Sequence, residues 1–227
     1  MPLQGHVFAA TDRLKGLDVN RPITAGDAAA LVEHGYGFAV RYVRRKSKHS
    51  YDLTAKEARA ILAAGFGLMV VQHVAPEGWT PSATLGSTYG STAAAEAGRI
   101  GVPPGVTVWC DLEGVSAGVS TKAVIDFCNR WHSKVAAEGF VPGLYVGYGA
   151  GLDADQLYRS LRFTHYWGAY NVAAADGPTR RGFQMRQRAA NAADRVPLFD
   201  AEFQVDDIHA DALGGLPTML VPDAWLE

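Results

Sequence analysis

Two acidic residues, Asp111 and Glu113, stand two positions apart in the segment Trp109-Cys-Asp-Leu-Glu113. The β-branched and aromatic residues before them predict a strand over residues 106–113. Side chains alternate between the two faces of a strand, so both carboxyl groups point to the same side, with Trp109 below them. Two carboxyl groups held this close raise the pKa of one of them, which keeps a proton donor available near neutral pH.

Paired carboxyl groups suit the cleavage of a glycosidic bond. One group protonates the leaving oxygen, and the other stabilises positive charge or positions the attacking group. The same spacing is common in salt bridges and loop caps, so the pair alone is weak evidence. Acidic residues at the ends of two other predicted strands, Asp18 and Asp206, favour a site, although each could instead cap a turn or a helix. The candidate catalytic residues are Glu113, Asp111, Asp18 and Asp206.

Aromatic and amide side chains lie near the same predicted strand ends. Sugar rings stack on aromatic faces, so Trp167 and Tyr170 beside Asn171 favour a carbohydrate site, with core packing as the alternative. Gln72 and Gln187 are polar residues inside strands and need hydrogen-bond partners in either case. We expect His73, the next residue, to face the helices. The candidate substrate-binding residues are Tyr42, Gln72, Tyr145, Tyr148, Trp167, Tyr170, Asn171 and Gln187.

Strand-like and helix-like segments alternate along the chain. Thr24 and Thr54 are expected to cap the first two helices, and the Gly/Ser/Thr-rich segment 76–92 is expected to form a long loop. The predicted helices span 24–34, 54–64, 93–100, 121–138 and 153–161. The predicted strands span 16–20, 36–43, 66–74, 106–113, 141–148, 165–171, 182–188 and 201–206.

Eight strands with interleaved helices predict an α/β fold, a single TIM-like (β/α)8 barrel over residues 1–227. Its core is expected over about 14–210, with the tail 213–227 packed beneath or beside the barrel. Segments 173–181 and 189–200 are too short or too broken for full helices, so we expect a distorted or incomplete last third. The active site of such a barrel lies at the C-terminal ends of its strands.

Composition narrows the classes of function. The chain is 48% hydrophobic and 19% charged, which is typical of a globular protein, and its net charge of −2 argues against a nucleic-acid partner. The basic residues Arg41, Arg44, Arg45, Lys46 and Lys48 are interpreted as a solvated loop rather than a phosphate site. No His-Glu-x-x-His motif or Cys/His pair occurs, so no metal and no other cofactor is expected.

The sequence shows no signal peptide and no apolar run long enough to span a membrane. Its two cysteines form no disulfide framework and fit folding in a reducing compartment. We therefore expect synthesis in the cytoplasm. A target in the cell wall would be reached after lysis or by dedicated secretion, and an immunity or delivery partner is left open.

A series of short motifs follows in order over about residues 14–210. They are Gly16-Leu-Asp18, Phe38-Ala-Val-Arg-Tyr42, Leu53-Thr54-x-x-Glu57-Ala58, Ala64-Gly-Phe66, Glu96-Ala-x-x-Ile100-Gly-Val-Pro103, Trp109-x-Asp111-x-Glu113 and Gly143-Leu-Tyr145-Val-Gly147-Tyr148. This order resembles DUF1906, a glycoside-hydrolase-like family whose best-known type is a mycobacterial Tat-exported protein. It is more remotely similar to the family 25 lysozymes, which cleave peptidoglycan.

The resemblance implies a barrel with acidic residues at its mouth and a polysaccharide substrate. By the lysozyme pattern, Glu113 is the proton donor, Asp111 holds the N-acetyl group or stabilises a charged intermediate, and Asp18 and Asp206 flank them. The sequence departs from that pattern at Val205-Asp206-Asp207. The resemblance as a whole implies a hydrolase of peptidoglycan or a similar amino-sugar polymer. The alternatives are a non-catalytic glycan-binding module on a degenerate hydrolase barrel and, less favoured, a metal-assisted barrel hydrolase.

Overall fold

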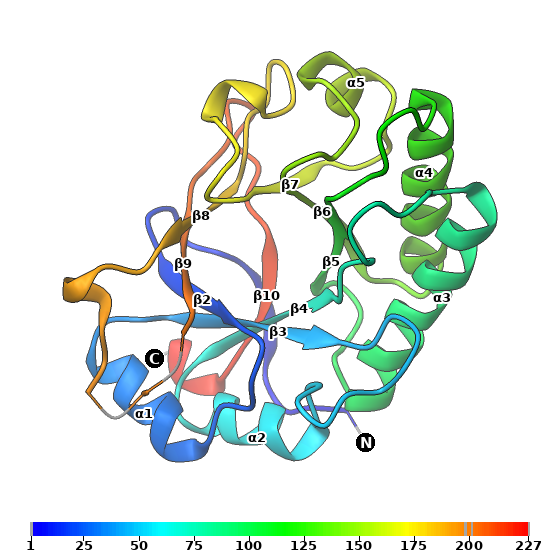
Figure 1. The fold of residues 1–227 in the computed structure, drawn as a ribbon. Coiled ribbons are helices and arrows are strands. Elements are labelled where there is room, and N and C mark those ends of the chain that lie inside the picture. The colour runs from blue at the N-terminus through cyan, green and yellow to red at the C-terminus, as the bar shows by residue number, and fades with distance from the viewer. Residues whose placement is uncertain (1, 198, 201, 227) are drawn as a thin grey trace.

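The computed structural model describes residues 2–197, 199–200 and 202–226. Within them, eight strands close a barrel in the order β2-β3-β4-β5-β6-β7-β8-β9, and β9 pairs back with β2 (Figure 1). The predicted TIM-like α/β barrel is confirmed. The strands are β2 (Lys15–Val19), β3 (Phe38–Val43), β4 (Gly67–Gln72), β5 (Thr107–Leu112), β6 (Val141–Val146), β7 (His165–Gly168), β8 (Met185–Ala189) and β9 (Gln204–Ile208).

The distortion expected in the last third lies in β9. Strands β2 to β8 pair in parallel, whereas β9 is antiparallel to both β8 and β2. The prediction that Asp206 ends a strand at the mouth is therefore wrong. Asp206 lies in the middle of β9, opposite Gly16 and Gln187, and the start of β9 is nearest the mouth. Ala201, the first residue of the predicted strand, lies outside the described residues.

Four helices begin and end close to their predicted positions: α1 (Ala25–Glu33), α2 (Ala55–Ala63), α4 (Thr121–Ala137) and α5 (Ala154–Arg159). The side chains of Thr24 and Thr54 accept hydrogen bonds from the backbone N–H groups of Asp27 and Glu57, so both predicted caps are confirmed. The helices lie outside the barrel along part of its circumference, and loops and short turns lie beside β8 and β9 (Figure 1). In the last third, short 3₁₀ turns at Ala174–Asp176 and Ala192–Asp194 stand where full helices would be.

The prediction of a loop over 76–92 is correct for residues 76–82 and wrong for residues 83–92, because helix α3 (Ala83–Ile100) begins at Ala83 and not at Ala93. Its first half is rich in small residues because it packs closely on α4. A Cβ atom at Gly86 would lie 2.2 Å from the carbonyl oxygen of Phe127, and one at Gly90 would lie 2.7 Å from that of Trp131. Close contact between the two helices therefore explains the glycines, which made this part of the helix look like a loop in the sequence.

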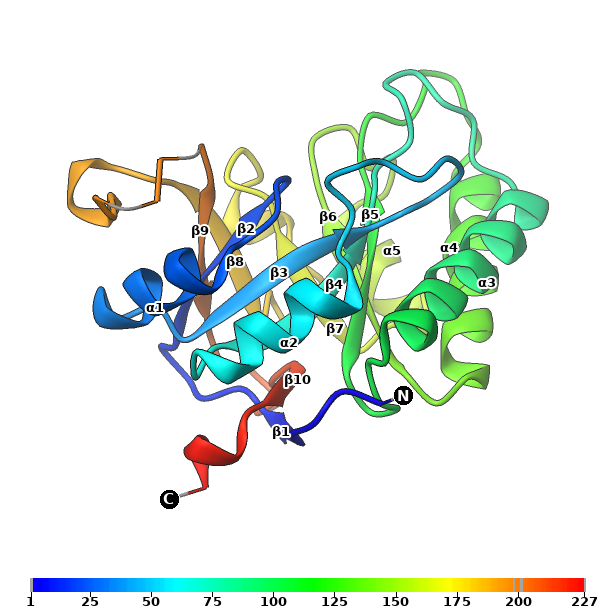
Figure 2. The same ribbon diagram turned by 90° about the horizontal axis from the view of Figure 1, so that it is seen from below.

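Strands β1 (His6–Ala9) and β10 (Thr218–Val221) form an antiparallel ribbon at the N-terminal end of the barrel. Leu220 of β10 pairs with Leu68 of β4. Figure 2 shows this ribbon and both termini at the end opposite the loops that follow β3, β4 and β5. Most of the tail thus lies beneath the barrel and ends in a 3₁₀ turn at Asp223–Trp225, while Glu227 lies outside the described residues.

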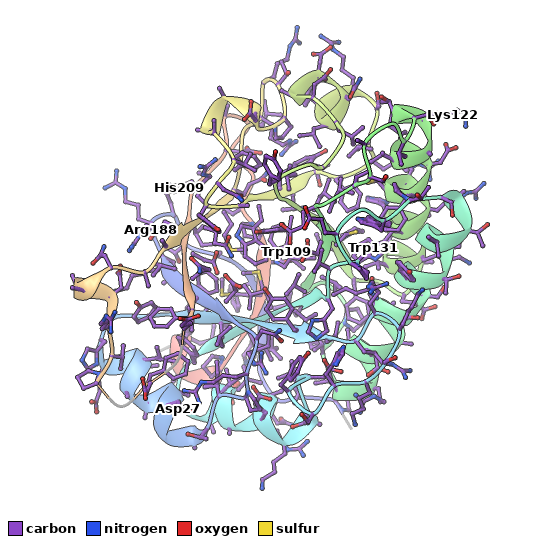
Figure 3. The ribbon with its side chains drawn as sticks, in the orientation of Figure 1. Asp27, Trp109, Lys122, Trp131, Arg188 and His209 are labelled. Carbon is purple, nitrogen blue, oxygen red and sulfur yellow. The ribbon has the colours of Figure 1, made fainter. Side chains whose placement is uncertain are left out.

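The core has two layers. Met69, Trp109, Trp167 and Met185 fill the barrel interior, and a larger layer between strands and helices includes Trp131. Figure 3 shows Trp109 near the centre of the barrel and Trp131 on α4, outside it. In the described part of the chain, no helix combines the length and apolar character needed to cross a membrane.

Candidate active site

The carboxyl pair lies at the C-terminal end of β5. Trp109 and Asp111 face the barrel interior, and Glu113 follows one step beyond the strand. Glu113 lines an open cavity of about 300 Å³, together with Val74, Ala75, Glu77, Gly114 and Tyr148. Trp79 donates a hydrogen bond from Nε1 to the backbone oxygen of Glu113 at 2.8 Å, which fixes the backbone at this point.

Gly143 in β6 and Gly147, just after this strand, leave room for the side chains of Trp109 and Glu113. A Cβ atom at Gly143 would lie 2.3 Å from the Trp109 ring, and one at Gly147 would lie 2.2 Å from Oε2 of Glu113. Any larger residue at Gly147 would displace the Glu113 carboxyl group. The Gly143-x-Tyr145-x-Gly147 pattern therefore has a direct structural purpose: it admits the side chains of β5.

Both carboxyl groups of the pair have a raised pKa. Burial raises the pKa of Asp111 well above its ordinary value, and the charges of Glu113 and Asp18 raise it further, while Arg45 lowers it. Burial, followed by the charge of Asp18, raises the pKa of Glu113. Oδ1 of Asp111 is buried and accepts no hydrogen bond from the described residues. Burial and neighbouring negative charge thus act in the same direction on both groups and favour their protonated forms over a wider pH range than in water.

Asp18, near the C-terminal end of β2, is the centre of a hydrogen-bond network just inside the barrel mouth. Tyr42 donates to Oδ1 at 2.9 Å, and Nε2 of Gln187 donates to Oδ2 at 2.7 Å. Tyr145 in turn donates to Oε1 of Gln187 at 3.1 Å. Burial raises the pKa of Asp18 to about 6 despite these hydrogen bonds, which lower it. The structure thus brings Asp18, Tyr42, Tyr145 and Gln187 together beside the carboxyl pair.

Asp206 lies deeper in the barrel than Asp18 and is fully buried. No described contact of its two carboxyl oxygens meets hydrogen-bond geometry, although Asp18 and the Trp167 indole lie close enough to act on it. Burial, with the charge of Asp18 second, raises its pKa well above the ordinary value. Asp206 is a buried acid beneath the site, and it caps no helix.

Trp167 is placed too deep to stack on a sugar, which corrects the sequence interpretation. Its ring is buried and packs edge-to-face against Trp109 at 5.7 Å and Tyr145 at 4.5 Å. Tyr148 and Tyr170, by contrast, are 72% and 57% exposed. Asn171 is also exposed, on the loop after β7. The rim of the site therefore offers two rings and an amide.

Gln72 does not belong to the site, and His73 takes the inner position. Gln72 accepts a hydrogen bond from Nε1 of Trp131 at 2.9 Å and donates to the backbone oxygen of Tyr89, so it faces α3 and α4. Because Met69 and Val71 fill the interior, the alternation of β4 turns the next odd-numbered residue inward. Both orientations predicted for these two residues are wrong.

Several residues near the mouth were not among the candidates. His73 stacks on Tyr42 with ring centroids 5.0 Å apart, and its Nε2 lies 2.7 Å from Oδ1 of the buried Asp52. Arg45 comes from the run interpreted as a solvated loop. No signal in the sequence indicated the orientation of His73, because every residue of β4 is buried and the apolar pattern does not distinguish its two faces. In residues 2–197, 199–200 and 202–226, no three or more His, Cys, Asp or Glu side chains are grouped to hold a metal ion.

Solved structures resemble this chain across most of its length. The Tat-secreted protein Rv2525c of Mycobacterium tuberculosis superimposes with a TM-score of 0.63 at 15% identity, covering 86% of this chain and 94% of that one. A lysozyme from Streptomyces coelicolor gives 0.61 at 16% identity, with 90% and 95% covered. A family 25 glycosyl hydrolase from Bacillus anthracis gives 0.60 at 12% identity, with 90% and 93% covered. At these identities the likeness concerns the fold.

No curated protein matches the chain in sequence. A family model described as the Rv2525c-like, glycoside hydrolase-like domain matches residues 29–197, which include β3 to β8 and the carboxyl pair. This match agrees with the fold and with the resemblance seen in the motifs. The chain belongs to the Rv2525c-like, glycoside hydrolase-like domain family.

Proposed function

We propose that this protein is a glycoside hydrolase that acts on peptidoglycan or a similar amino-sugar polymer. The observation that carries the proposal is the position of Glu113. This residue lines an open cavity beyond the end of β5, close enough to Asp111 for its charge to act on that carboxyl group, and the exposed residue Tyr148 lines the same cavity. A proton donor beside an aromatic face suits a sugar chain laid across the mouth.

In the proposed mechanism Glu113 donates its proton to the glycosidic oxygen as the bond from that oxygen to the anomeric carbon breaks. Asp111 assists by holding the substrate's N-acetyl group or by stabilising the positive charge that develops on the sugar. A water molecule then adds to the anomeric carbon and returns a proton to the site. Asp18, held by Tyr42 and Gln187, supplies a fixed negative charge nearby.

Structural neighbours support this class of substrate. They include the Streptomyces coelicolor lysozyme, a muramidase from Acremonium alcalophilum and the catalytic domain of an endolysin from a Listeria phage. A cell-wall substrate lies outside the cytoplasm, so we also propose that the protein reaches it after lysis or by dedicated secretion. A delivery or immunity partner would belong to that step.

The test is digestion of purified peptidoglycan by the parent protein and by Glu113→Gln, with the fragments identified by mass spectrometry. The variant keeps the shape of the side chain but has no acidic proton. We expect new reducing ends from the parent and a loss of at least about 10²-fold in rate for the variant, the usual weight of general acid catalysis. Glu138→Gln, at the far end of α4, is the matched control and should digest at the parental rate.

A glycan-binding module is the second candidate, and one observation favours it. Tyr148 and Tyr170 are exposed at the rim, and two aromatic rings can hold a sugar chain by stacking without any acid. A binding module would bind oligosaccharides with equal affinity in the parent and in Glu113→Gln, and neither protein would release fragments. Tyr148→Ala and Tyr170→Ala would then weaken binding, because both rings are exposed at the rim.

A further inference from the structure

A second cavity, of about 270 Å³, adjoins the one that Glu113 lines. Its walls are Arg45, Lys46, Ser47, His49, His73 and Val74. Val74 lines both cavities, so the two share a wall. Arg45 also acts electrostatically on Asp111, whose pKa it lowers, which places its charge close to the carboxyl pair. A sugar chain held at Glu113 could therefore extend a substituent into this second cavity.

The arginines of the basic run differ in what neutralises them. Arg41 is buried against Glu57 at 2.7 Å, and Arg44 pairs with Glu96 at 2.8 Å. No carboxylate within 4 Å pairs with Arg45 among the residues the structure describes. Its guanidinium is nevertheless held in place: Nε donates to the Val74 carbonyl at 3.0 Å and Nη1 donates to the Tyr89 hydroxyl at 3.0 Å.

Lys46 adds a second positive charge to the same place. Its Nζ lies 5.9 Å from the centroid of the Tyr89 ring, and the guanidinium carbon of Arg45 lies 5.1 Å from it. Both cations thus gather over one aromatic ring, and none of the six lining residues is acidic. A positioned arginine that is not neutralised, with a lysine beside it, is the usual arrangement for binding a carboxylate or a phosphate group.

The buried Asp52 shapes the opposite wall. Its Oδ1 lies 2.7 Å from Nε2 of His73, and its Oδ2 accepts the backbone N–H of His49 at 2.7 Å. The ring of His49 stacks on Tyr51 and meets His73 edge-on at 5.1 Å. Both carboxyl oxygens of Asp52 therefore position the histidines, and Asp52 is buried and does not line the cavity.

We propose that this second cavity, with Arg45 and Lys46 as its cations, binds an anionic substituent, a carboxylate or a phosphate ester, on the sugar next to the glycosidic bond that Glu113 faces. The inference rests on the proposed function and deepens it by naming the class of glycan. Neutral glycans lack the group that the two cations would hold. The basic run is then part of a binding site, and the interpretation of Arg45 and Lys46 as a solvated loop is replaced.

The test is calorimetric binding of three tetrasaccharides to the Glu113→Gln protein. One is the neutral N-acetylglucosamine tetramer, one alternates N-acetylglucosamine with carboxylate-bearing N-acetylmuramic acid, and one is the neutral tetramer phosphorylated on its 6-hydroxyl groups. Each is measured again after a further Lys46→Gln or Lys48→Gln substitution. Lys48 is an exposed residue of the same loop and does not line the cavity, so the two variants change net charge equally.

We expect an anionic tetrasaccharide to bind about tenfold more tightly than the neutral one at low salt, which is the weight of one good charge-assisted contact. Lys46→Gln should weaken that binding about fivefold and leave the neutral tetramer unchanged, whereas Lys48→Gln should change neither. Arg45→Gln should weaken it more, with the melting temperature measured to show that the variant is folded. The anionic tetrasaccharide whose binding these substitutions weaken identifies the substituent as a carboxylate or a phosphate.

Equal binding of all three tetrasaccharides, unchanged by Lys46→Gln and Arg45→Gln, would overturn the anion site and leave the proposed hydrolase intact. The proposed function fails differently: the parent protein would release no fragments from peptidoglycan. If no tetrasaccharide bound either, the inference would be overturned as well, because it depends on a glycan at Glu113.

Discussion

Several carboxyl groups lie in or beside a barrel interior that is otherwise lined by apolar side chains such as Trp109, Met69 and Met185. Asp18, Asp111, Glu113 and Asp206 all have a pKa above the ordinary value, with burial as the largest cause in each case. Native proteins hold such groups at a cost in stability where function uses them. The fold is therefore expected to be more stable when one of these carboxyl groups is replaced by a side chain that does not ionise, and Asp206 is the clearest case.

Asp206→Asn is expected to stabilise the fold at pH 8 by about 1 kcal/mol or more, because the amide avoids the cost of holding a buried carboxyl group whose pKa is raised above its unfolded value. The native pKa of Asp206 is raised above the unfolded value, so the native state binds more protons in the window that begins near pH 4. The free energy of unfolding of the parent therefore falls as pH rises through that window. The asparagine does not titrate, so its advantage should grow from pH 4 to pH 8.

Urea unfolding at pH 4 and at pH 8 measures this difference. Asp207→Asn is the matched control, because Asp207 is the next residue but is partly exposed and pairs with Arg188 at 3.0 Å. Removing that charge should cost up to about 1 kcal/mol, the opposite sign. An Asp206→Asn advantage of the same size at both pH values would contradict the assignment of a raised pKa.

Residue-level prediction from the sequence succeeded where strand alternation was read correctly. The facing of Asp111, Glu113 and Trp109 follows from a period of two and holds in the structure. The same rule failed at Gln72 and His73, because a strand that is apolar on both faces does not reveal which face is inside. The depth of Trp167 was hidden for a related reason, since depth depends on the strands opposite it.

At the scale of elements, α3 shows how a helix can escape recognition. Its residues Gly86 and Gly90 lower intrinsic helix propensity, yet they allow α3 and α4 to approach so closely that backbone meets backbone. Packing between the helices thus outweighs propensity. The helices with ordinary amphipathic patterns and Thr caps, α1 and α2, were predicted to within about a residue because both signals lie within the segment itself.

Gly86→Ala is expected to destabilise the protein by about 1–3 kcal/mol, because the added methyl group would force α3 away from Phe127. Gly98→Ala, in the same helix, is the matched control. A Cβ atom there meets nothing within 4 Å, so the substitution should stabilise the helix by up to about 1 kcal/mol. Thermal or urea unfolding of both variants measures the pair. Equal effects of the two would show that helix propensity, and not the α3–α4 contact, governs these positions.

At the scale of the whole molecule, two long-range features escaped the sequence interpretation. An isolated strand pattern has no direction, so nothing local in Gln204–Ile208 distinguishes an antiparallel β9 from a parallel one. The β1–β10 ribbon joins residues more than 200 positions apart, for example His6 and Val221. The barrel class was predictable because it depends on the order of elements, whereas these pairings depend on where distant segments meet.

The ribbon closes the barrel at the end opposite the proposed site, and Met219 of β10 is fully buried there against the interior layer. Met219→Ala should therefore leave a cavity and lower the free energy of unfolding by about 2–5 kcal/mol. Leu213→Ala, a comparable truncation at an exposed position of the same tail, should cost less than about 0.5 kcal/mol. Both are measured by urea unfolding.

The effect of Met219→Ala on function should be small at temperatures where the variant is folded, because β10 pairs with β1 and with the N-terminal end of β4, opposite the mouth. Oligosaccharide affinity measured well below the melting temperature should therefore match that of the parent. A large loss of affinity in a folded Met219→Ala protein would mean that packing at the floor of the barrel sets the position of Trp109 and, through it, of the carboxyl pair. The stability of the barrel and the geometry of its mouth would then be coupled through the interior layer.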